Sequence, residues 1–215
     1  MQIKHKVMMM GFAPFVALAG CGTLRVERVE RSVTEPWVCR CSAERPVLSG
    51  EMAPQQAAID EWIATSLILF GLYEEPTIDG ALLRQCTYEP EPFGEEPASY
   101  ATNVVVQGRI LFADEEYLSY EVRLDAFEHN KNRGVWSFSR GRALTLDDIF
   151  RWKTLPGLTD NFSINERGME FVRNGFEVRG YFTDPAIVLF ICWEDLKPYL
   201  KQDFKLPQGS NTKGK

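Results

Sequence analysis

Histidine is almost absent from this chain of 215 residues, which holds only His5 and His129. A zinc motif of the His-x-x-x-His type needs two histidines four residues apart, so no such motif is present. The sequence also lacks a Gly-x-Ser-x-Gly segment and a glycine-rich phosphate-binding loop. Any Ser/His/Asp or Cys/His site would have to use His129, which lies in a polar stretch that we expect to be an exposed turn. We therefore predict no catalytic residues, no metal ligands and no cofactor.

An excess of positive charge is lacking as well, since 24 lysines and arginines face 30 acids and the formal net charge is −6. Without a basic stripe, the chain is a poor candidate for binding nucleic acid. The charge instead favours a cationic partner. Seven acids and one base, Arg84, lie within residues 74–97. A solvated face is the ordinary explanation of such a run. The alternative is a partner-binding role, for which the candidates are Glu89, Glu91, Glu95 and Glu96.

The N-terminus lacks the long apolar run of a membrane-spanning helix. Its apolar stretch, residues 7–18, is only about a dozen residues long, whereas a spanning helix needs about 20. Lys4 and Lys6 precede this stretch, a pattern typical of a signal peptide. An ordinary secretory signal and a wrongly assigned start site are the two alternatives to a lipid-modified signal.

The apolar stretch ends in Leu-Ala-Gly-Cys, which has the form of a lipobox. We therefore predict a lipoprotein signal peptide over residues 1–20 and a diacylglycerol on Cys21 that anchors the protein in a lipid bilayer. Loss of two lysines and no acids moves the formal charge from −6 to −8. Residue 22 is glycine rather than aspartate. In a Gram-negative cell, the sorting rules for lipoproteins then imply the outer membrane, facing the periplasm.

Four cysteines remain after Cys21, and an even number in an exported protein suggests disulfides. Cys39 with Cys41 is the least favoured pair, because so small a ring is strained. Cys86 paired with either of them would close a loop worth roughly 3–4 kcal/mol in the chain-entropy model. We expect Cys192 to be buried in an apolar strand. Buried thiols or a metal site are the alternatives, although Cys-x-Cys is not the usual spacing of zinc ligands.

Hydrophobic periodicity predicts an α+β fold: an antiparallel sheet, one main amphipathic helix and short edge helices. The helix is expected over residues 54–71, with the stripe Ile59, Ile63, Leu67 and Phe70. The run 74–97 is expected to be a loop with one helical turn near 81–85. Strands are expected at 104–112, with a bulge at Gly108, and at 118–126, where alternation indicates one buried and one wet face.

Further along, residues 129–134 are expected to form a turn, and Thr145 is expected to cap a short helix that begins with Asp147 and Asp148. Asn174-Gly175 predicts a hairpin. The apolar run 186–193 is expected to be a central strand, followed by a helical segment over 194–200. We thus expect a lipidated tether over 21–35, a single binding domain over 36–203 with halves of about 36–112 and 113–203, and a flexible basic tail over 204–215.

Several of these segments resemble the RsiV-like domain family over roughly residues 36–200. The resemblance rests on Leu118-Ser119-Tyr120-Glu121-Val122, on the run Arg140-Gly141-Arg142 through Phe150, on the closing stretch from Phe190 to Leu200, and on Pro46-Val47-Leu48 with the helix that follows. The chain departs from the family where members often carry a Gly-Gly-Ala-His-like segment, since only His129-Asn130 lies near that place. The family includes extracytoplasmic lysozyme sensors and domains attached to peptidoglycan deacetylases. The resemblance therefore implies a binding module, and no binding residue carries over.

Together these features predict a non-enzymatic, envelope-anchored binding lipoprotein. The expected partner is a cationic protein, such as a cell-wall hydrolase or a competitor's toxin, whose cleft the lipoprotein would occlude. An immunity protein against a secreted effector is a close variant. The alternatives are a cell-wall enzyme that uses carboxylates and a structural envelope lipoprotein.

Overall fold

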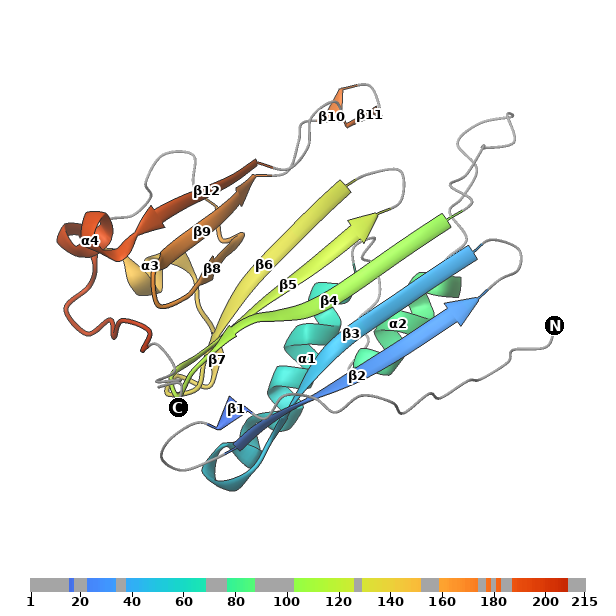
Figure 1. Ribbon diagram of the computed structural model, residues 1–215, viewed down its shortest axis with the longest axis horizontal. Helices are drawn as coiled ribbons and strands as arrows, with labels where there is room; N and C mark the ends of the chain where they lie inside the picture. Colours follow the sequence, from blue (N-terminus) through green and yellow to red (C-terminus); the bar gives the residue numbers. More distant parts are fainter. Residues whose placement is uncertain are drawn as a thin grey trace, which may run out of the picture.

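Two β-sheets, a short two-stranded ribbon and a layer of helices make up the computed structural model of this chain (Figure 1). The structure describes residues 16–17, 23–33, 38–68, 77–87, 103–125, 129–151, 159–173, 177–178, 181–182 and 187–208. The α+β class predicted from the sequence is confirmed. No helix among the described residues is both long enough and apolar enough to span a membrane.

The larger sheet holds seven strands, which lie side by side in the order of the chain. Neighbouring strands run antiparallel, except that β3 and β4 run parallel, with Val38 opposite Asn103. The sheet is therefore mixed rather than antiparallel as predicted. A parallel pair needs a crossover connection, and here it contains the helices between β3 and β4. The strands are β1 (Val16–Ala17), β2 (Thr23–Val33), β3 (Val38–Leu48), β4 (Asn103–Ala113), β5 (Tyr117–Asp125), β6 (His129–Ser137) and β7 (Arg142–Ala143).

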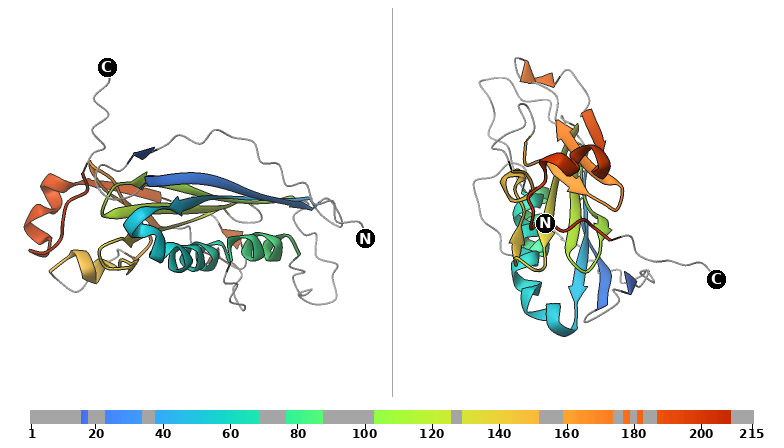
Figure 2. Two further views of the ribbon diagram at one scale, coloured as in Figure 1. Left: turned by 90° about the horizontal axis from the view of Figure 1, so that it is seen from below. Right: turned by 90° about the vertical axis from the view of Figure 1, so that its left-hand side faces the viewer.

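Two helices cover one face of this sheet (Figure 2, left). The first, α1 (Gln56–Leu67), follows a 3-10 helix, η1 (Gly50–Gln55), and buries Ile59, Ile63 and Leu67 as the stripe predicted. Phe70, the fourth predicted member, lies outside the described residues.

The second helix, α2 (Ile78–Thr87), occupies part of the run predicted to be a loop with a single turn, and that prediction is wrong. Its buried side chains recur at helical spacing, and the Thr77 hydroxyl accepts a hydrogen bond from the Gly80 N–H at its start. The prolines and most of the acids that suggested a loop lie outside this stretch.

The smaller sheet has the strand order β12-β9-β8 and packs beside β5 and β6. Its strands are β8 (Phe162–Ile164), β9 (Gly168–Arg173) and β12 (Ile187–Cys192), and a ribbon of β10 (Glu177–Val178) and β11 (Tyr181–Phe182) lies between β9 and β12 in the chain. Asn174-Gly175, where a hairpin was predicted, lies outside the described residues, but β9 pairs with β8 and β12 rather than with β10, which pairs with β11. Both edges of β9 are thereby occupied.

Opposite faces of β5 belong to two hydrophobic cores. Leu118, Tyr120, Val122 and Leu124 pack in the core beneath the helices, whereas Tyr117 belongs to the core of the smaller sheet. The predicted wet face of β5 is therefore covered at Ser119 and Glu121, whereas Arg123 on the same face is exposed. Ser119 is fully buried, and its hydroxyl donates to the Ile164 carbonyl at 2.7 Å. Alternation gave the right strand here, but the polar side chains on the first part of its second face meet another sheet rather than water.

Both ends of the predicted domain also need correction. Residues 23–33 are not a tether, because β2 pairs with β3 from Leu24 opposite Leu48 to Val33 opposite Cys39. The alternation of charged and apolar residues there is the period of a strand. At the other end, the Phe204 ring stacks against Tyr117, so residues 204–208 are not a free tail. Residues 209–215 lie outside the described part of the chain.

Two further local predictions are wrong and two are confirmed. Residues 129–134 are not a turn but the first part of β6, and the irregularity in β4 lies between Ile110 and Phe112 rather than at Gly108. The helix that Thr145 was expected to cap is α3 (Leu146–Ile149). The closing helical segment is confirmed as α4 (Trp193–Leu196) and η2 (Lys197–Tyr199).

Candidate functional site

The most unusual surface in the described part of the chain is the outer edge of the smaller sheet. β12 has the sequence Ile-Val-Leu-Phe-Ile-Cys, a run of β-branched and aromatic residues that favours a strand. It pairs with β9 along its whole length, from Ile187 opposite Arg173 to Cys192 opposite Gly168. In the strand order of this sheet β12 stands at one end, so its other edge has no neighbour among the described strands.

Four consecutive apolar side chains of β12 are exposed. The exposed fractions are 63% for Ile187, 40% for Val188, 50% for Leu189 and 41% for Phe190. Since alternate side chains of a strand point to opposite faces, β12 is apolar and accessible on both faces. The prediction of a buried central strand is therefore wrong, although the reasoning behind it was sound. A strand that is apolar on both sides normally has apolar neighbours on both sides.

The platform beneath β12 is well packed. Met169, Phe171 and Val172 of β9 are buried, and the Trp193 indole N–H donates to the Asn165 carbonyl at 2.8 Å. A Cβ on Gly168 would come within 2.2 Å of the Ile191 carbonyl oxygen and 2.9 Å of Phe190 Cζ. Glycine at this position therefore lets β12 and its Phe190 ring lie close against β9.

Two contacts with charged side chains flank the exposed run of β12. The Arg167 guanidinium lies 5.6 Å from the centre of the Phe190 ring, within the range of a cation–π contact. Cys192 is partly exposed rather than buried as predicted, and its thiol donates to the Asp195 carboxylate at 3.0 Å. The exposed apolar stretch thus ends at a polar corner where α4 begins.

A buried ion-pair network fixes this sheet to the larger one. Glu121 of β5 is 1% exposed, and Arg133 of β6 donates to its carboxylate at 2.7 Å. Arg133 also donates to Glu170 of β9, and Arg109 donates to Glu121 from the other side. Burial would raise the pKa of Glu121, but the hydrogen bonds and charges of Arg133 and Arg109 outweigh it and hold that pKa below its usual value. The edge strand is consequently presented by a firmly anchored sheet.

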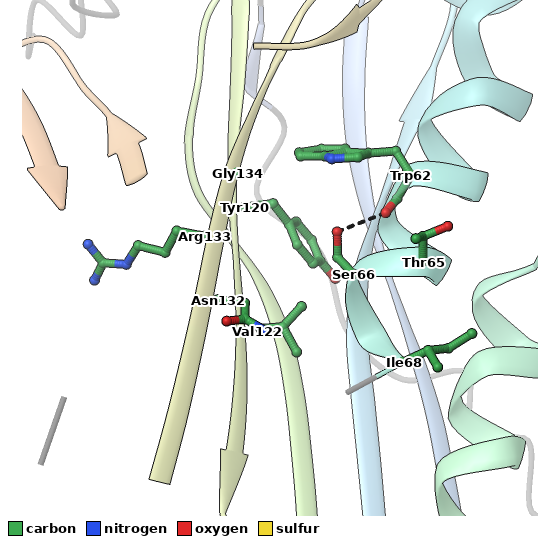
Figure 3. Close-up of a pocket in the computed structure, with 9 residues that line it drawn as sticks. All are labelled: Trp62, Thr65, Ser66, Ile68, Tyr120, Val122, Asn132, Arg133 and Gly134. Carbon is green, nitrogen blue, oxygen red and sulfur yellow. Dashed lines mark hydrogen bonds between the residues drawn. The ribbon is translucent and has the colours of Figure 1, made fainter. Parts of the chain in front are cut away.

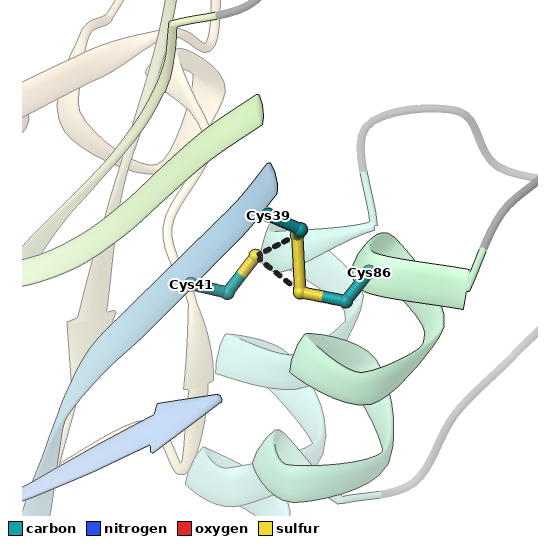
Figure 4. A group of neighbouring side chains, drawn as sticks. All are labelled: Cys39, Cys41 and Cys86. Carbon is teal, nitrogen blue, oxygen red and sulfur yellow. Dashed lines mark hydrogen bonds between the residues drawn. A yellow bond between two sulfur atoms is a disulfide. The ribbon is translucent and has the colours of Figure 1, made fainter. Parts of the chain in front are cut away.

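The residues predicted as sites lie elsewhere. Cys21 and the four candidate acids Glu89, Glu91, Glu95 and Glu96 lie outside the described residues, so the structure places none of them. Cys39, Cys41 and Cys86 come together in the larger core (Figure 4). The predicted disulfide is present, with Cys39 rather than Cys41 as the partner of Cys86, and it ties β3 to α2.

The third sulfur of this cluster, that of Cys41, is a free thiol. It lies 3.3 Å from the Cys39 sulfur and 3.4 Å from the Cys86 sulfur, and burial raises its pKa to about 12. The three sulfur atoms lie within 4.8 Å of one another, a spacing that suits metal ligation. With Cys39 and Cys86 joined, however, only the Cys41 thiol could bind a metal, whereas structural zinc sites take four ligands. The cluster is therefore a structural crosslink with one unreactive thiol.

Sequence reasoning did not find the β12 edge, because an apolar run has the same pattern whether it is central or exposed. The run is six residues long and lacks alternating polar residues. Both features fit a buried strand as well as an exposed edge strand.

No family model and no curated protein sequence matches this chain. Two solved structures share its fold. One is a member of the DUF3298 family from Bacteroides fragilis, with a TM-score of 0.59, 13% identity, and coverage of 85% of this chain and 96% of that one. The other is a DUF3298 family protein from Pseudomonas aeruginosa PAO1, with a TM-score of 0.55, 10% identity, and coverage of 87% and 97%. The alignments cover nearly the whole of each of those two chains, so the likeness extends over their full fold.

Proposed function

We propose that this chain is an envelope-anchored, non-enzymatic lipoprotein that binds a cationic protein along the edge of β12. The observation that carries the proposal is the run of four exposed apolar residues on an edge strand. Contiguous apolar surface is rare on monomeric proteins and marks an interaction site. An edge strand also directs alternate backbone N–H and C=O groups outward, where a partner's strand pairs with them.

Charge and contact have separate roles in this proposal. The formal charge of −6, or −8 without residues 1–20, attracts a basic partner from a distance and speeds the encounter. The apolar side chains of β12 then supply the short-range contact. A lysozyme-type cell-wall hydrolase or a secreted toxin has the required positive charge, and occlusion of its cleft gives an immunity-like outcome.

The sequence resemblance to RsiV-like domains and the fold shared with two DUF3298 structures are compatible with this role. The fold itself does not specify a partner. Anchoring rests on the lipobox at Cys21, which would hold the binding domain at a membrane surface where envelope hydrolases act.

The test measures binding of the purified mature chain to a purified cationic lysozyme by surface plasmon resonance, together with lysozyme activity on cell walls. Leu189→Ser should weaken binding at least tenfold, because it removes an apolar side chain from the centre of the proposed contact. Leu83→Ser is the matched control: Leu83 is also exposed, at 36%, but lies on α2. Equal weakening by both substitutions, or no binding by the unaltered chain, would refute a lysozyme-type partner at this edge.

A further inference from the structure

A second candidate site lies away from β12, between α1 and the larger sheet. A cavity of about 220 Å³ opens there, lined from α1 by Trp62, Thr65 and Ser66 and from the strands by Tyr120, Val122 and Asn132. Figure 3 shows the Trp62 indole edge-on, with one face turned toward Tyr120 and Ser66. The cavity shares no residue with β12.

Two glycines make room for the aromatic rings of this cavity. A Cβ on Gly134, which lies opposite Tyr120, would come within 2.9 Å of the Trp62 ring. A Cβ on Gly108 would come within 2.3 Å of the Tyr120 hydroxyl oxygen. Any other residue at either position would displace a ring, so the cavity walls depend on glycine at both.

The Tyr120 hydroxyl is buried and has no hydrogen-bond partner among the described residues. Tyr120 is 2% exposed, and its ring reaches from β5 toward α1 (Figure 3). An unsatisfied buried hydroxyl costs about as much free energy as a lost hydrogen bond. Burial, with a smaller contribution from Glu44, raises the pKa of Tyr120 well above its usual value, so the hydroxyl keeps its proton, but its oxygen is too buried to contact a ligand in the cavity.

The lining offers no free charge. The Arg133 backbone lines the cavity, but its guanidinium points away and pairs with Glu121 and Glu170 on the opposite face (Figure 3). The remaining polar groups are hydroxyls and an amide, from Thr65, Ser66 and Asn132. Such a set matches a neutral ligand that carries several hydroxyl groups of its own.

We propose that this cavity binds a single neutral pyranose ring, with the C–H face of the sugar against Trp62 and its hydroxyl groups toward Thr65, Ser66 and Asn132. The electron-rich face of an indole attracts the weakly positive C–H bonds of a sugar ring. The volume, smaller than the usual range of drug-sized pockets, limits the ligand to one ring. The ring is either a free monosaccharide or the end residue of a glycan chain.

The experiment titrates the purified mature chain with the methyl glycosides of glucose and N-acetylglucosamine, followed by tryptophan fluorescence and calorimetry. A ligand of about a dozen non-hydrogen atoms should bind with a dissociation constant of about 1 mM. A chitin oligosaccharide tested alongside separates the two sources. If it binds more tightly than the glycoside, the natural ligand is the end of a glycan chain. If both bind equally, the natural ligand is a free monosaccharide. No response to any of these sugars, or binding of indole but of no glycoside, overturns the proposal.

Variants tie the response to the cavity. Tyr120→Phe removes a buried oxygen that no ligand in the cavity can reach, so this variant is the control and should leave sugar binding unchanged. Gly134→Ala should weaken it by displacing the indole. Leu189→Ser on β12 should leave sugar binding unchanged, so this proposal and the proposed protein partner fail or succeed separately. Sugar binding that Gly134→Ala leaves unaltered would place the sugar outside the cavity and refute the assignment.

Discussion

Asp148 shows how one carboxylate can organise a corner of the fold. It is 8% exposed, and it accepts hydrogen bonds from Arg140, from Arg142 and from the backbone N–H of Thr145. The hydrogen bond from Arg142 is the largest of the effects that hold the pKa of Asp148 well below its usual value, against the opposing effect of burial. The capping role predicted from the sequence is confirmed, but the two arginines could be assigned to Asp148 only once the β6–β7 turn was known.

Substitution of this residue should change both stability and its pH dependence. Since the pKa of Asp148 is lower in the folded than in the unfolded chain, its contribution is full above the unfolded value of about 4 and is lost as pH falls below it. Asp148→Asn should cost about 2 kcal/mol at pH 7 and should flatten the decline in acid. Urea denaturation at several pH values measures both effects.

The neighbouring Asp147→Asn is the matched control for this prediction. Asp147 is exposed on the same short helix, so its loss should change the free energy of unfolding by less than about 0.5 kcal/mol. An equal cost for both variants, or an unaltered acid decline in Asp148→Asn, would contradict the role assigned to Asp148.

A second prediction at the scale of a single residue concerns the lipidation of Cys21. Cys21→Ala should abolish incorporation of labelled fatty acid, because the thiol is the only group in a lipobox that accepts the diacylglycerol. Cys192→Ala, which alters a partly exposed thiol elsewhere, should leave labelling intact. Labelling of Cys21→Ala at the level of the unaltered chain would contradict lipidation, and fractionation with the inner membrane would contradict the expected sorting.

The disulfide that joins β3 to α2 leads to a prediction about two elements of the fold. Cys39 and Cys86 are 47 residues apart, so removal of both should cost about 3–4 kcal/mol in the chain-entropy model, and Cys41→Ala should cost less. Peptide mapping without reduction should recover Cys39 joined to Cys86. In the native protein Cys41 should react with thiol reagents far more slowly than Cys192, because burial raises the pKa of Cys41 to about 12. Comparable rates would contradict the buried position of Cys41.

Helices and strands with a clear hydrophobic period could be predicted from the sequence, whereas the elements that pack against them could not. The stripe of α1 and the alternation of β5 gave the right elements because each pattern matches a backbone period. The prolines that follow α2 led to the prediction of a loop, although five residues of α2 are buried at helical spacing. The charged residues of β2 led to the prediction of a solvated tether, although they occupy the outward positions of a strand. Periodicity shows that a face is buried, but it does not show what covers it.

The candidate site could not be predicted from the sequence for the same reason. β12 was assigned to the centre of a sheet because its residues are apolar on both faces, yet its position depends on the pairing of β9, which joins residues distant in the chain. Local pattern contains no information on strand order. The cavity beside Trp62 was equally hidden, since it requires Gly108, Tyr120 and Gly134 from three strands to meet one helix.

Charge is one property of the entire chain that the sequence does determine, and it leads to a kinetic prediction. If acidic residues steer the encounter, the association rate with a cationic lysozyme should fall steeply as salt rises, while the dissociation rate changes much less. Replacement of Glu89, Glu91, Glu95 and Glu96 by glutamine reduces the net charge of the chain without residues 1–20 from −8 to −4. This variant should therefore associate several-fold more slowly at low ionic strength.

The difference between the two proteins should shrink at physiological salt, where the Debye length is about 8 Å and exposed charges are screened from the approaching partner. Dissociation should stay nearly constant in this variant but accelerate in Leu189→Ser, because apolar contact rather than charge holds the complex together once it has formed. Stopped-flow or surface plasmon resonance at two salt concentrations separates these effects. Unchanged association at both concentrations would remove the four acids from the binding process and leave β12 as the sole determinant. Faster dissociation in the glutamine variant alone would instead place the acids within the contact and β12 outside it.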